Sequence, residues 1–429
     1  MKRLRQRLDY LRESAPGFIE EAVSTSGAAH DSRIEALRRK LQAFSPGQLS
    51  KRKLKRAAVE KLSELPGENW ETAYGQARVV RQCLAIDHHH GCVPVNAALA
   101  AEPQHLATVA LDPLLGTIDV QRFLFIDTET TGLMGGTGTV PFLIGMAWFE
   151  SGVMVLRQAL LPRPGEEQPM LGLLAERLSQ ASCIVTYNGK SFDWPLLRTR
   201  FVMNRIAPPP LPPHLDLLHC SRRIFRRTLD DVRLISVEER VLGFERCDDL
   251  PGELIPQRYF DYLRGGDAAG LLPIIEHNAN DLIALAAIVG VLAQRVGQAP
   301  EELAPKEALC LSELAVRHGD VERALALAEH AARSTRDDAI ALLSLRLGAL
   351  LLKRSGRYSE AAMCLHEALP FAVDDRCIAA QLHLVLAKLY EHKLGDAAAA
   401  LKHAHASQLA EEPYAHDVRI RRLEKRLKL

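Results

Sequence analysis

The pattern of hydrophobic and polar residues changes once along the chain, near residue 298. Before this point, short apolar runs of strand length alternate with segments whose apolar residues recur at helical spacing. The run RFLFIDTE (122–129) has apolar residues on both faces, as in a central strand. After residue 298 the strand signals vanish, and Ala- and Leu-rich helical sequence continues almost to the end. The pattern therefore predicts an α/β domain followed by an all-α domain.

Individual elements can be assigned within the α/β part. The segments VPFLIGMAWF (140–149) and VMVLRQALL (153–161) are separated by the turn residues Ser151 and Gly152, and they predict a β-hairpin. The other expected elements are, in order, a helix at 170–181, a strand at 183–189, a helix at 192–205, a proline-rich connector at 207–214, and helices at 215–227, 234–244 and about 271–296.

The all-α part contains an internal repeat. Three stretches align on a glycine that is followed five residues later by an alanine, and the glycines are 37 and 39 residues apart (356−319 and 395−356). The pattern resembles tetratricopeptide repeats, in which glycine marks the turn between paired helices and small residues let the helices pack closely. The aligned positions are Gly319, Gly356 and Gly395, with Ala324, Ala361 and Ala400.

These patterns divide the chain into three predicted domains. Residues 1–78 form a basic, mainly helical N-terminal region, residues 79–297 the α/β domain, and residues 298–429 the repeat domain. Residues 1–61 hold 15 Lys and Arg against 7 Asp and Glu, a net charge of +8. The basic segment at 49–62 has apolar residues at helical spacing, and it either contacts phosphate or forms a solvated helical face.

Overall composition limits the classes of function. The chain has 54 Lys and Arg against 53 Asp and Glu, so no field of the whole protein attracts a polyanion. No run approaches 18 apolar residues and the start lacks an apolar signal, so we expect a cytoplasmic protein without a membrane span.

The eight cysteines form no CxxC motif, which argues against a structural zinc site. The consecutive residues His88 to His90 cannot all face one metal from a strand, so a loop or strand end is expected there.

Two carboxylates mark the end of the central strand. Asp127 and Glu129 are two residues apart, so both side chains point to the same face. Two ionised carboxylates in an apolar setting repel each other and are poorly solvated, which raises their pKa values. A divalent cation relieves this conflict, and hard carboxylate oxygens suit Mg²⁺ or Mn²⁺.

Two later motifs carry further candidate residues. Asp193 follows the expected strand and Asn188-Gly189, where it is either a site residue or an acid that favours the start of a helix. His277 and Asp281 are four residues apart and share one helix face. They are either a proton acceptor beside a metal ligand or an ordinary surface pair.

The three motifs, in this order over 154 residues (281−127), resemble those of the DEDD (DnaQ-like) 3′–5′ exonucleases. The segments TETTGLMGGTGTVPFLIG, YNGKSFDWPLL, RYFDYLRGGD and EHNANDLIAL are similar to a narrower group, the predicted bacterial exonucleases of the YprB type. This resemblance implies a ribonuclease-H-like fold, with a mixed sheet and helices on both faces, ahead of the repeat domain.

The resemblance also implies a metal-dependent nuclease, a 3′–5′ exonuclease acting on single-stranded DNA or RNA. Asp127, Glu129, Asp193 and Asp281 would hold two Mg²⁺ or Mn²⁺ ions, and His277 would be the general base. One feature departs from the family pattern. The histidine lies five residues before the last aspartate in the histidine-type enzymes, and a tyrosine lies four before it in the tyrosine-type enzymes, whereas here a histidine lies four before it. The position and role of His277 therefore stay open, and its neighbours Asn278 and Asn280 are the alternative candidates for orienting the water.

Basic residues near the motifs are candidates for phosphate contacts, which position a strand without reading its sequence. These candidates are Lys190, Arg198, Arg222, Arg223 and Arg226. Among them lie Phe192, Trp194 and Phe225, which either stack on bases or pack in the core.

Some features allow other readings. Asp216 is either a fifth acid at the site or a structural acid at a helix start, while Asp230, Asp231, Asp248 and Asp249 are expected at turns or caps. The glycine-rich segment at 131–142 is not followed by Gly-Lys-Ser/Thr, which disfavours nucleoside triphosphate binding.

The repeat domain is expected to bind a protein or to pack on itself. The alternative function is therefore a non-catalytic scaffold that works through its helical repeats.

Overall fold

The structure is a computed structural model that describes residues 65–132, 138–247 and 249–428. The chain divides into two units, residues 1–63 and 64–429. The predicted basic helix at 49–62 and the centre of the glycine-rich segment, 133–137, lie outside the described residues.

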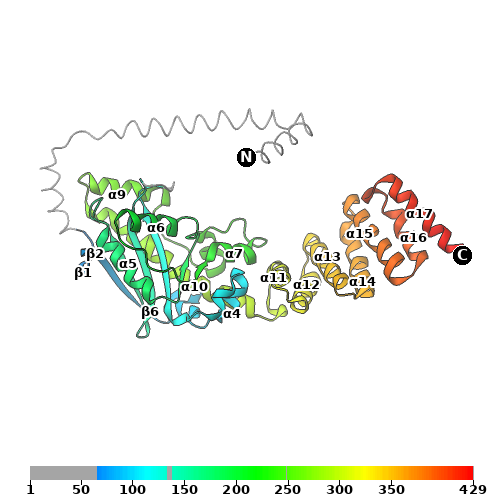
Figure 1. The fold of residues 1–429 in the computed structure, drawn as a ribbon, viewed down its shortest axis with the longest axis horizontal. Coiled ribbons are helices and arrows are strands. Elements are labelled where there is room, and N and C mark those ends of the chain that lie inside the picture. Colours follow the sequence, from blue (N-terminus) through cyan, green and yellow to red (C-terminus); the bar gives the residue numbers. More distant parts are fainter. Residues whose placement is uncertain (1–64, 133–137, 248, 429) are drawn as a thin grey trace, which may run out of the picture. The chain divides into compact units, whose positions relative to one another are not determined.

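A mixed seven-stranded sheet forms the core of the α/β domain, as predicted (Figure 1). Its strand order is β1-β2-β7-β6-β5-β8-β9, in which β5 pairs parallel with β8 and β8 parallel with β9, while the other neighbours are antiparallel. The sheet begins at residue 68, before the predicted domain start at residue 79. Its strands are β1 (Glu68–Thr72), β2 (Gly75–Ala85), β5 (Phe123–Thr130), β6 (Pro141–Glu150), β7 (Val153–Leu160), β8 (Cys183–Thr186) and β9 (His214–Asp216).

Both faces of the sheet are covered, which explains why β5 is apolar at successive positions. Phe123 and Phe125 pack into one core, and Leu124 and Ile126 pack into the other. The first core is shared with α4 (Pro103–Ala110), α7 (Leu217–Phe225) and α10 (Leu272–Gly297), and the second with α5 (Gln168–Gln180), α6 (Asp193–Met203) and α9 (Ile255–Leu263). Each buried Phe, Leu or Ile contributes about 1.5–3 kcal/mol to this packing.

Helix α10 is the longest helix of the described chain, with 26 residues. By length and composition it could cross a membrane, a property that the sequence pattern did not predict, but 83% of its most apolar window is buried inside the protein. Gly290 lets it approach the segment at 95–98, because a Cβ at this position would lie 2.4 Å from the Cβ of Ala97. The helix is therefore packed as a core helix of the α/β domain.

The predicted local elements mostly form. Strands β6 and β7 pair as a hairpin around Ser151 and Gly152, both with positive φ. The helix expected at 234–244 is instead a short helix, α8 (Leu234–Val237), followed by a π-helical turn that ends at Gly243 with φ of +68°. This irregular turn places Glu238 inside the protein.

The histidine run lies at a strand end, as expected. Strand β3 (His89–His90) pairs with β4 (Val93–Pro94). His89 is exposed whereas His90 is buried, and Nε2 of His90 lies 2.8 Å from Oε1 of Glu238. Neighbouring histidines therefore face opposite sides.

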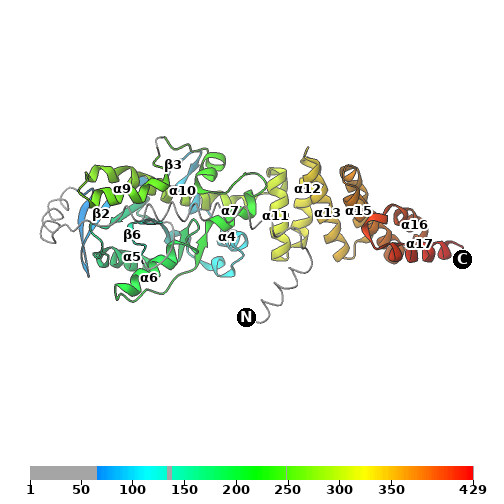
Figure 2. The same cartoon turned by 90° about the horizontal axis from the view of Figure 1, so that it is seen from above.

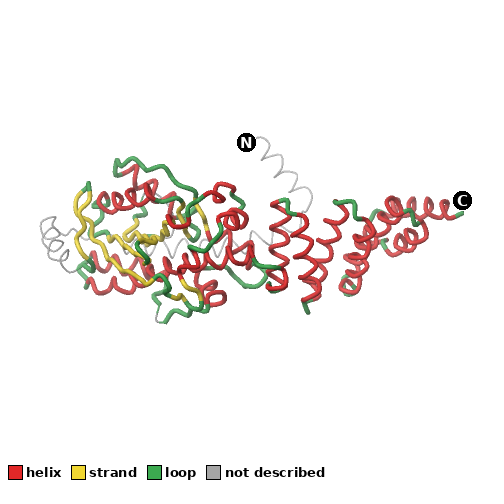
Figure 3. The backbone as a smooth tube through the Cα atoms, turned by 90° about the horizontal axis from the view of Figure 1, so that it is seen from below, coloured by secondary structure: helices red, strands yellow, loops and turns green. Residues whose placement is uncertain are grey.

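The repeat domain consists of helices packed in antiparallel pairs (Figure 2). Gly319, Gly356 and Gly395 have φ of +84°, +77° and +74°, and each lies in the turn within a pair. Ala324, Ala361 and Ala400 are fully buried between helices. Among the described residues, strands occur only before residue 217, and helices alone follow (Figure 3). The helices are α11 (Pro305–His318), α12 (Val321–Ser334), α13 (Asp338–Arg354), α14 (Tyr358–Ala368), α15 (Arg376–Leu389), α16 (Ala397–Ala406) and α17 (Pro413–Leu427).

Candidate active site

The end of β5 presents the first two candidate carboxylates. Asp127 and Glu129 alternate with Thr128, so they share the face that β5 turns towards α10. The pairing with β6 shifts register between Glu129 and Thr130. Both side chains are half-buried, so solvent can reach these carboxylates at the end of β5.

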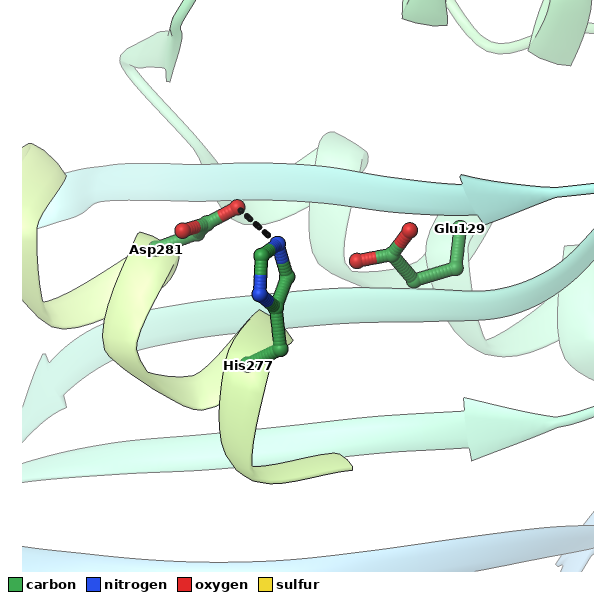
Figure 4. Close-up of side chains that lie close together, drawn as sticks. All are labelled: Glu129, His277 and Asp281. Atoms are coloured by element: carbon green, nitrogen blue, oxygen red, sulfur yellow. Dashed lines mark ion pairs between the residues drawn. The ribbon is translucent and has the colours of Figure 1, made fainter. Parts of the chain in front are cut away.

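Helix α10 brings the third motif to the same place. His277 and Asp281 lie one turn apart, and Nε2 of His277 is 3.6 Å from Oδ2 of Asp281. Glu129, His277 and Asp281 each offer a ligand atom, and these atoms lie within 4.8 Å of one another. In Figure 4 the Glu129 carboxylate points towards the imidazole, and the histidine and aspartate project from one helix. Two motifs about 150 residues apart in sequence therefore meet.

The second motif reaches the site from the N-terminus of α6. Asp193 is the first residue of that helix, and its Oδ1 accepts a hydrogen bond of 2.5 Å from Oγ1 of Thr128. Negative charge on Asp193 contributes to the electrostatics of both Asp127 and Glu129. Asp193 therefore contacts the same strand through Thr128, while the ligand atoms that lie within 4.8 Å of one another among the described residues are those of Glu129, His277 and Asp281, without Asp127 or Asp193.

Asp216 supports the loop before Asp193. Its carboxylate accepts hydrogen bonds from the backbone N–H groups of Asn188 (2.9 Å), Lys190 (3.1 Å) and Leu218 (3.1 Å). The last of these caps α7, and Asn188 has a φ of +67° that the bond helps to hold. Asp216 is therefore a structural acid at a helix start and not a fifth acid of the site.

Burial, together with nearby negative charge, disfavours the ionised form of each of these acids. Burial raises the pKa of Asp127 well above its ordinary value, and repulsion from Asp281, Glu129 and Asp193 raises it further. Burial and repulsion from Asp281 raise the pKa of Glu129 to about 7. Burial also raises the pKa of Asp193 to about 6 and raises that of Asp281. The site therefore favours a bound cation, as the sequence pattern predicted.

A buried amide holds one oxygen of Asp127. Asn278 is fully buried, and its Nδ2 donates to Oδ2 of Asp127 at 2.7 Å. Gln158 of β7 donates to Oδ1 of Asn278 at 2.9 Å, which fixes the orientation of the amide. Gly145 of β6 makes room, because a Cβ there would lie 2.2 Å from Oδ1 of Asn278. One carboxylate oxygen of Asp127 is thus oriented by the protein.

Arg246 pairs with the acid on α10. Its guanidinium donates to Oδ1 of Asp281 and lies 2.7 Å from Oε2 of Glu238. The ion pair occupies one oxygen of Asp281 but does not turn the carboxylate away, because Oδ2 still faces His277. The side chain of Asp281 is 13% exposed and that of Arg246 only 4%. Arg246 therefore offsets part of the negative charge from inside the protein.

Asp249 differs from the expected turn residue. Its Oδ1 lies 2.8 Å from Nδ1 of His277, and its Oδ2 accepts from Nη1 of Arg246 at 3.2 Å. Burial lowers the pKa of His277, but the charge of Asp281 and the bond to Asp249 outweigh it, so the pKa lies above its ordinary value. By contrast, Asp231 is a turn residue that accepts from the backbone of Arg233.

Sequence reasoning missed Arg246, Asp249 and Gln158 because nothing in their spacing links them to the motifs. Asn278, next to His277 in the third motif, was considered for orienting water, but it is fully buried and bonds Asp127 instead. Only the fold reveals that Asn278 is buried against the acid of β5.

The predicted phosphate contacts separate into two groups. Arg223 donates from Nη1 to the carbonyl of Val109 at 2.9 Å, and Arg226 pairs with Glu313 of α11. These two arginines therefore join parts of the protein to one another. Arg226 is exposed in spite of this ion pair, and the other candidates with exposed side chains are Lys190, Arg198 and Arg222.

The aromatic candidates also differ from one another. Phe225 is fully buried in the core beneath α7, which excludes base stacking by this ring. Trp194 packs partly buried against the other core. Phe192 is 56% exposed immediately before Asp193, so it is the ring of the three that solvent reaches most.

The chemistry of this donor set suits a hard divalent cation. Asp127, Glu129, Asp193 and Asp281 offer carboxylate oxygens, the ligands that Mg²⁺ and Mn²⁺ prefer. Burial raises the pKa of each acid, and a bound cation would favour the ionised form again. With a histidine alongside, the arrangement can activate water next to bound metal.

Comparison with known proteins agrees with this site. A family model described as the RNase_H superfamily matches residues 124–293, which include all five predicted catalytic residues. YprB of Bacillus subtilis (strain 168), described as uncharacterised, is 35% identical over 292 residues, or 67% of this chain and 69% of YprB. RNase H-like nucleases act on nucleic acid and generally use divalent metals, so the fold indicates a metal-dependent nuclease. The chain thus belongs to the RNase_H superfamily, in the family that includes YprB.

Proposed function

We propose that this protein is a 3′–5′ exonuclease that hydrolyses phosphodiester bonds of single-stranded nucleic acid with two Mg²⁺ or Mn²⁺ ions. The observation that carries the proposal is geometric: ligand atoms of Glu129, His277 and Asp281 lie within 4.8 Å of one another, and Asp127 shares the strand face of Glu129. The motif order, shared with the DEDD exonucleases, supports the exonuclease class. The raised pKa values support a bound cation, because an acid cluster that serves only packing gains nothing from this repulsion.

Each residue has a role in the proposed reaction. Asp127, Glu129, Asp193 and Asp281 would hold the cations, which supply Lewis acidity that stabilises charge on the attacking and leaving oxygens. The Asn278 amide keeps Asp127 oriented through its 2.7 Å bond. His277 accepts the proton of the attacking water at Nε2, the nitrogen on the side of Asp281 and Glu129. Its position four residues before Asp281 places both groups on one face of α10.

The remaining features define how substrate would approach. Exposed Lys190, Arg198 and Arg222 would contact phosphates, and exposed Phe192 would stack on a base next to Asp193. The helical repeats would serve as a surface for a protein partner.

The test is digestion of single-stranded DNA and RNA oligonucleotides that carry a label at the 5′ or the 3′ end, in the presence of Mn²⁺. We expect the 5′-labelled strand to shorten stepwise and the 3′ label to be released as a 5′-mononucleotide. Asp127→Asn should remove this activity, whereas Glu253→Gln, at an exposed position of the surface, should retain it.

Other outcomes would contradict specific parts of the proposal. Cleavage of a circular single strand would show an endonuclease. Absence of cleavage of every substrate, with Asp127→Asn indistinguishable from the unaltered protein, would favour the scaffold alternative.

A further inference from the structure

The contact between Asp249 and His277 has a consequence for the reaction. Nδ1 of His277 lies 2.8 Å from Oδ1 of Asp249, and the two side chains are 17% and 19% exposed. Building on the proposed function, we propose that Asp249 is a positioning residue that fixes the tautomer and ring orientation of His277, so that Nε2 can accept the proton. Asp249 belongs to none of the three motifs and would itself bind neither metal nor substrate.

The chemistry of the two groups determines where the proton lies. An ionised carboxylate only accepts hydrogen bonds, so Nδ1 carries the hydrogen in this contact. A neutral imidazole has one donor and one acceptor nitrogen, so Nε2 is left as the acceptor. Nη1 of Arg246 also lies 3.3 Å from Nδ1, but this distance is longer than the contact to the carboxylate. Nε2 is the nitrogen that faces Asp281.

Asp249 is itself held in place by buried charges. Nη1 of Arg246 donates to its Oδ2 at 3.2 Å, which leaves Oδ1 for the histidine. Arg246 is anchored by Glu238, whose side chain is completely buried, and Glu238 also contacts His90 of β3 at 2.8 Å. A carboxylate that is bonded through both oxygens cannot rotate freely. His277 therefore meets an acceptor of fixed orientation.

This arrangement makes an unusual prediction for an amide at position 249. In Asp249→Asn, the amide oxygen would turn to Arg246, because a guanidinium only donates. The amide NH₂ would then face Nδ1 of His277 and would require Nδ1 to be an acceptor. The proton would move to Nε2, the nitrogen needed for accepting a proton from water. An isosteric change would therefore impair the reaction, as a misplaced tautomer does in other histidine-dependent enzymes.

The experiment compares Asp249→Asn, Asp249→Ala and the matched control Asp231→Asn, which alters a surface aspartate that also pairs with an arginine. We expect kcat of Asp249→Asn to fall roughly 100-fold, with KM and Mn²⁺ affinity changed less than about two-fold. Nitrogen-15 NMR of the imidazoles, with His277 assigned through His277→Gln, should show hydrogen on Nδ1 in the unaltered protein and on Nε2 in Asp249→Asn.

The outcomes separate this inference from the proposed function. Full activity of Asp249→Asn together with loss in Asp249→Ala would show that the side chain only fills space, and would overturn the inference. Hydrogen on Nε2 in the unaltered protein would overturn it as well, whether or not the protein cleaves nucleic acid. Lack of nuclease activity in the unaltered protein would refute the proposed function alone, while the NMR result would still decide whether Asp249 sets the tautomer.

Discussion

Burial of Glu129 and its repulsion by Asp281 predict that removing this negative charge stabilises the metal-free protein. Glu129→Gln keeps the size of the side chain and removes its charge. The rise in the pKa of Glu129 from 4.5 to about 7 corresponds to about 3 kcal/mol of unfavourable free energy for the ionised group in the folded state. Glu129→Gln should therefore raise the free energy of unfolding by up to about this amount at pH 8.

The effect has a defined dependence on pH. Below pH 4.5 the carboxyl is protonated in both the folded and the unfolded state, so the variant and the unaltered protein should be equally stable. Between pH 4.5 and about 7 the folded state binds more protons than the unfolded state, so stability of the unaltered protein falls as pH rises. Above pH 7 the difference should be constant.

The assay is urea unfolding followed by circular dichroism in EDTA, at pH 5 and pH 8, with Glu253→Gln as the control at an exposed site. Addition of Mn²⁺ at pH 8 should narrow this difference, because the unaltered protein gains about 2.7 kcal/mol at a concentration of 100 Kd. The variant lacks one ligand and should gain less. The reasoning is refuted if Glu129→Gln is no more stable than the unaltered protein in EDTA at pH 8, or if Mn²⁺ stabilises both equally.

Three further substitutions test the packing around the site by the same unfolding assay. Gly145→Ala should lower the free energy of unfolding by about 1–3 kcal/mol and weaken Mn²⁺ binding, because its Cβ would lie 2.2 Å from Oδ1 of Asn278. The control Gly348→Ala lies in a helix with open space around the new Cβ, and it should raise the free energy of unfolding by about 0.5–1 kcal/mol. Equal effects of the two substitutions would contradict the steric argument. Asp216→Ala should cost about 3 kcal/mol, since three backbone N–H groups lose their acceptor; a loss below about 0.5 kcal/mol would show that water replaces it. Glu313→Ala should lower the free energy of unfolding by less than about 1 kcal/mol, and 1 M NaCl should reduce this loss, because the ion pairs of Glu313 are partly exposed. A loss of stability that salt leaves unchanged would contradict its electrostatic origin.

The motifs of the site could be predicted from sequence because each belongs to a local pattern. Asp127 and Glu129 share a strand face, and His277 and Asp281 share a helix face, so period and spacing were sufficient. Gly319 and its two repeat partners were equally readable, because a positive φ in a turn favours glycine. The family resemblance joined these local patterns into one site.

The supporting residues could not be predicted because their contacts depend on tertiary structure. Asp249 lies in an irregular segment, and its partner is 28 residues away on α10. Arg246 follows a π-helical turn that spacing rules read as a regular helix. Arg226 was interpreted as a phosphate contact because it is basic, but its partner Glu313 belongs to the next domain. Charge alone does not distinguish a contact within the protein from one with a ligand.

The central claim is that acids from three distant motifs hold two divalent cations at one place. Anomalous diffraction from crystals soaked in Mn²⁺ tests it most directly. Two anomalous peaks within coordination distance of Asp127, Glu129, Asp193 and Asp281 are predicted, and both should be absent from crystals of Asp127→Asn. Manganese at no position among these carboxylates, or only at positions on the protein surface, would contradict the account.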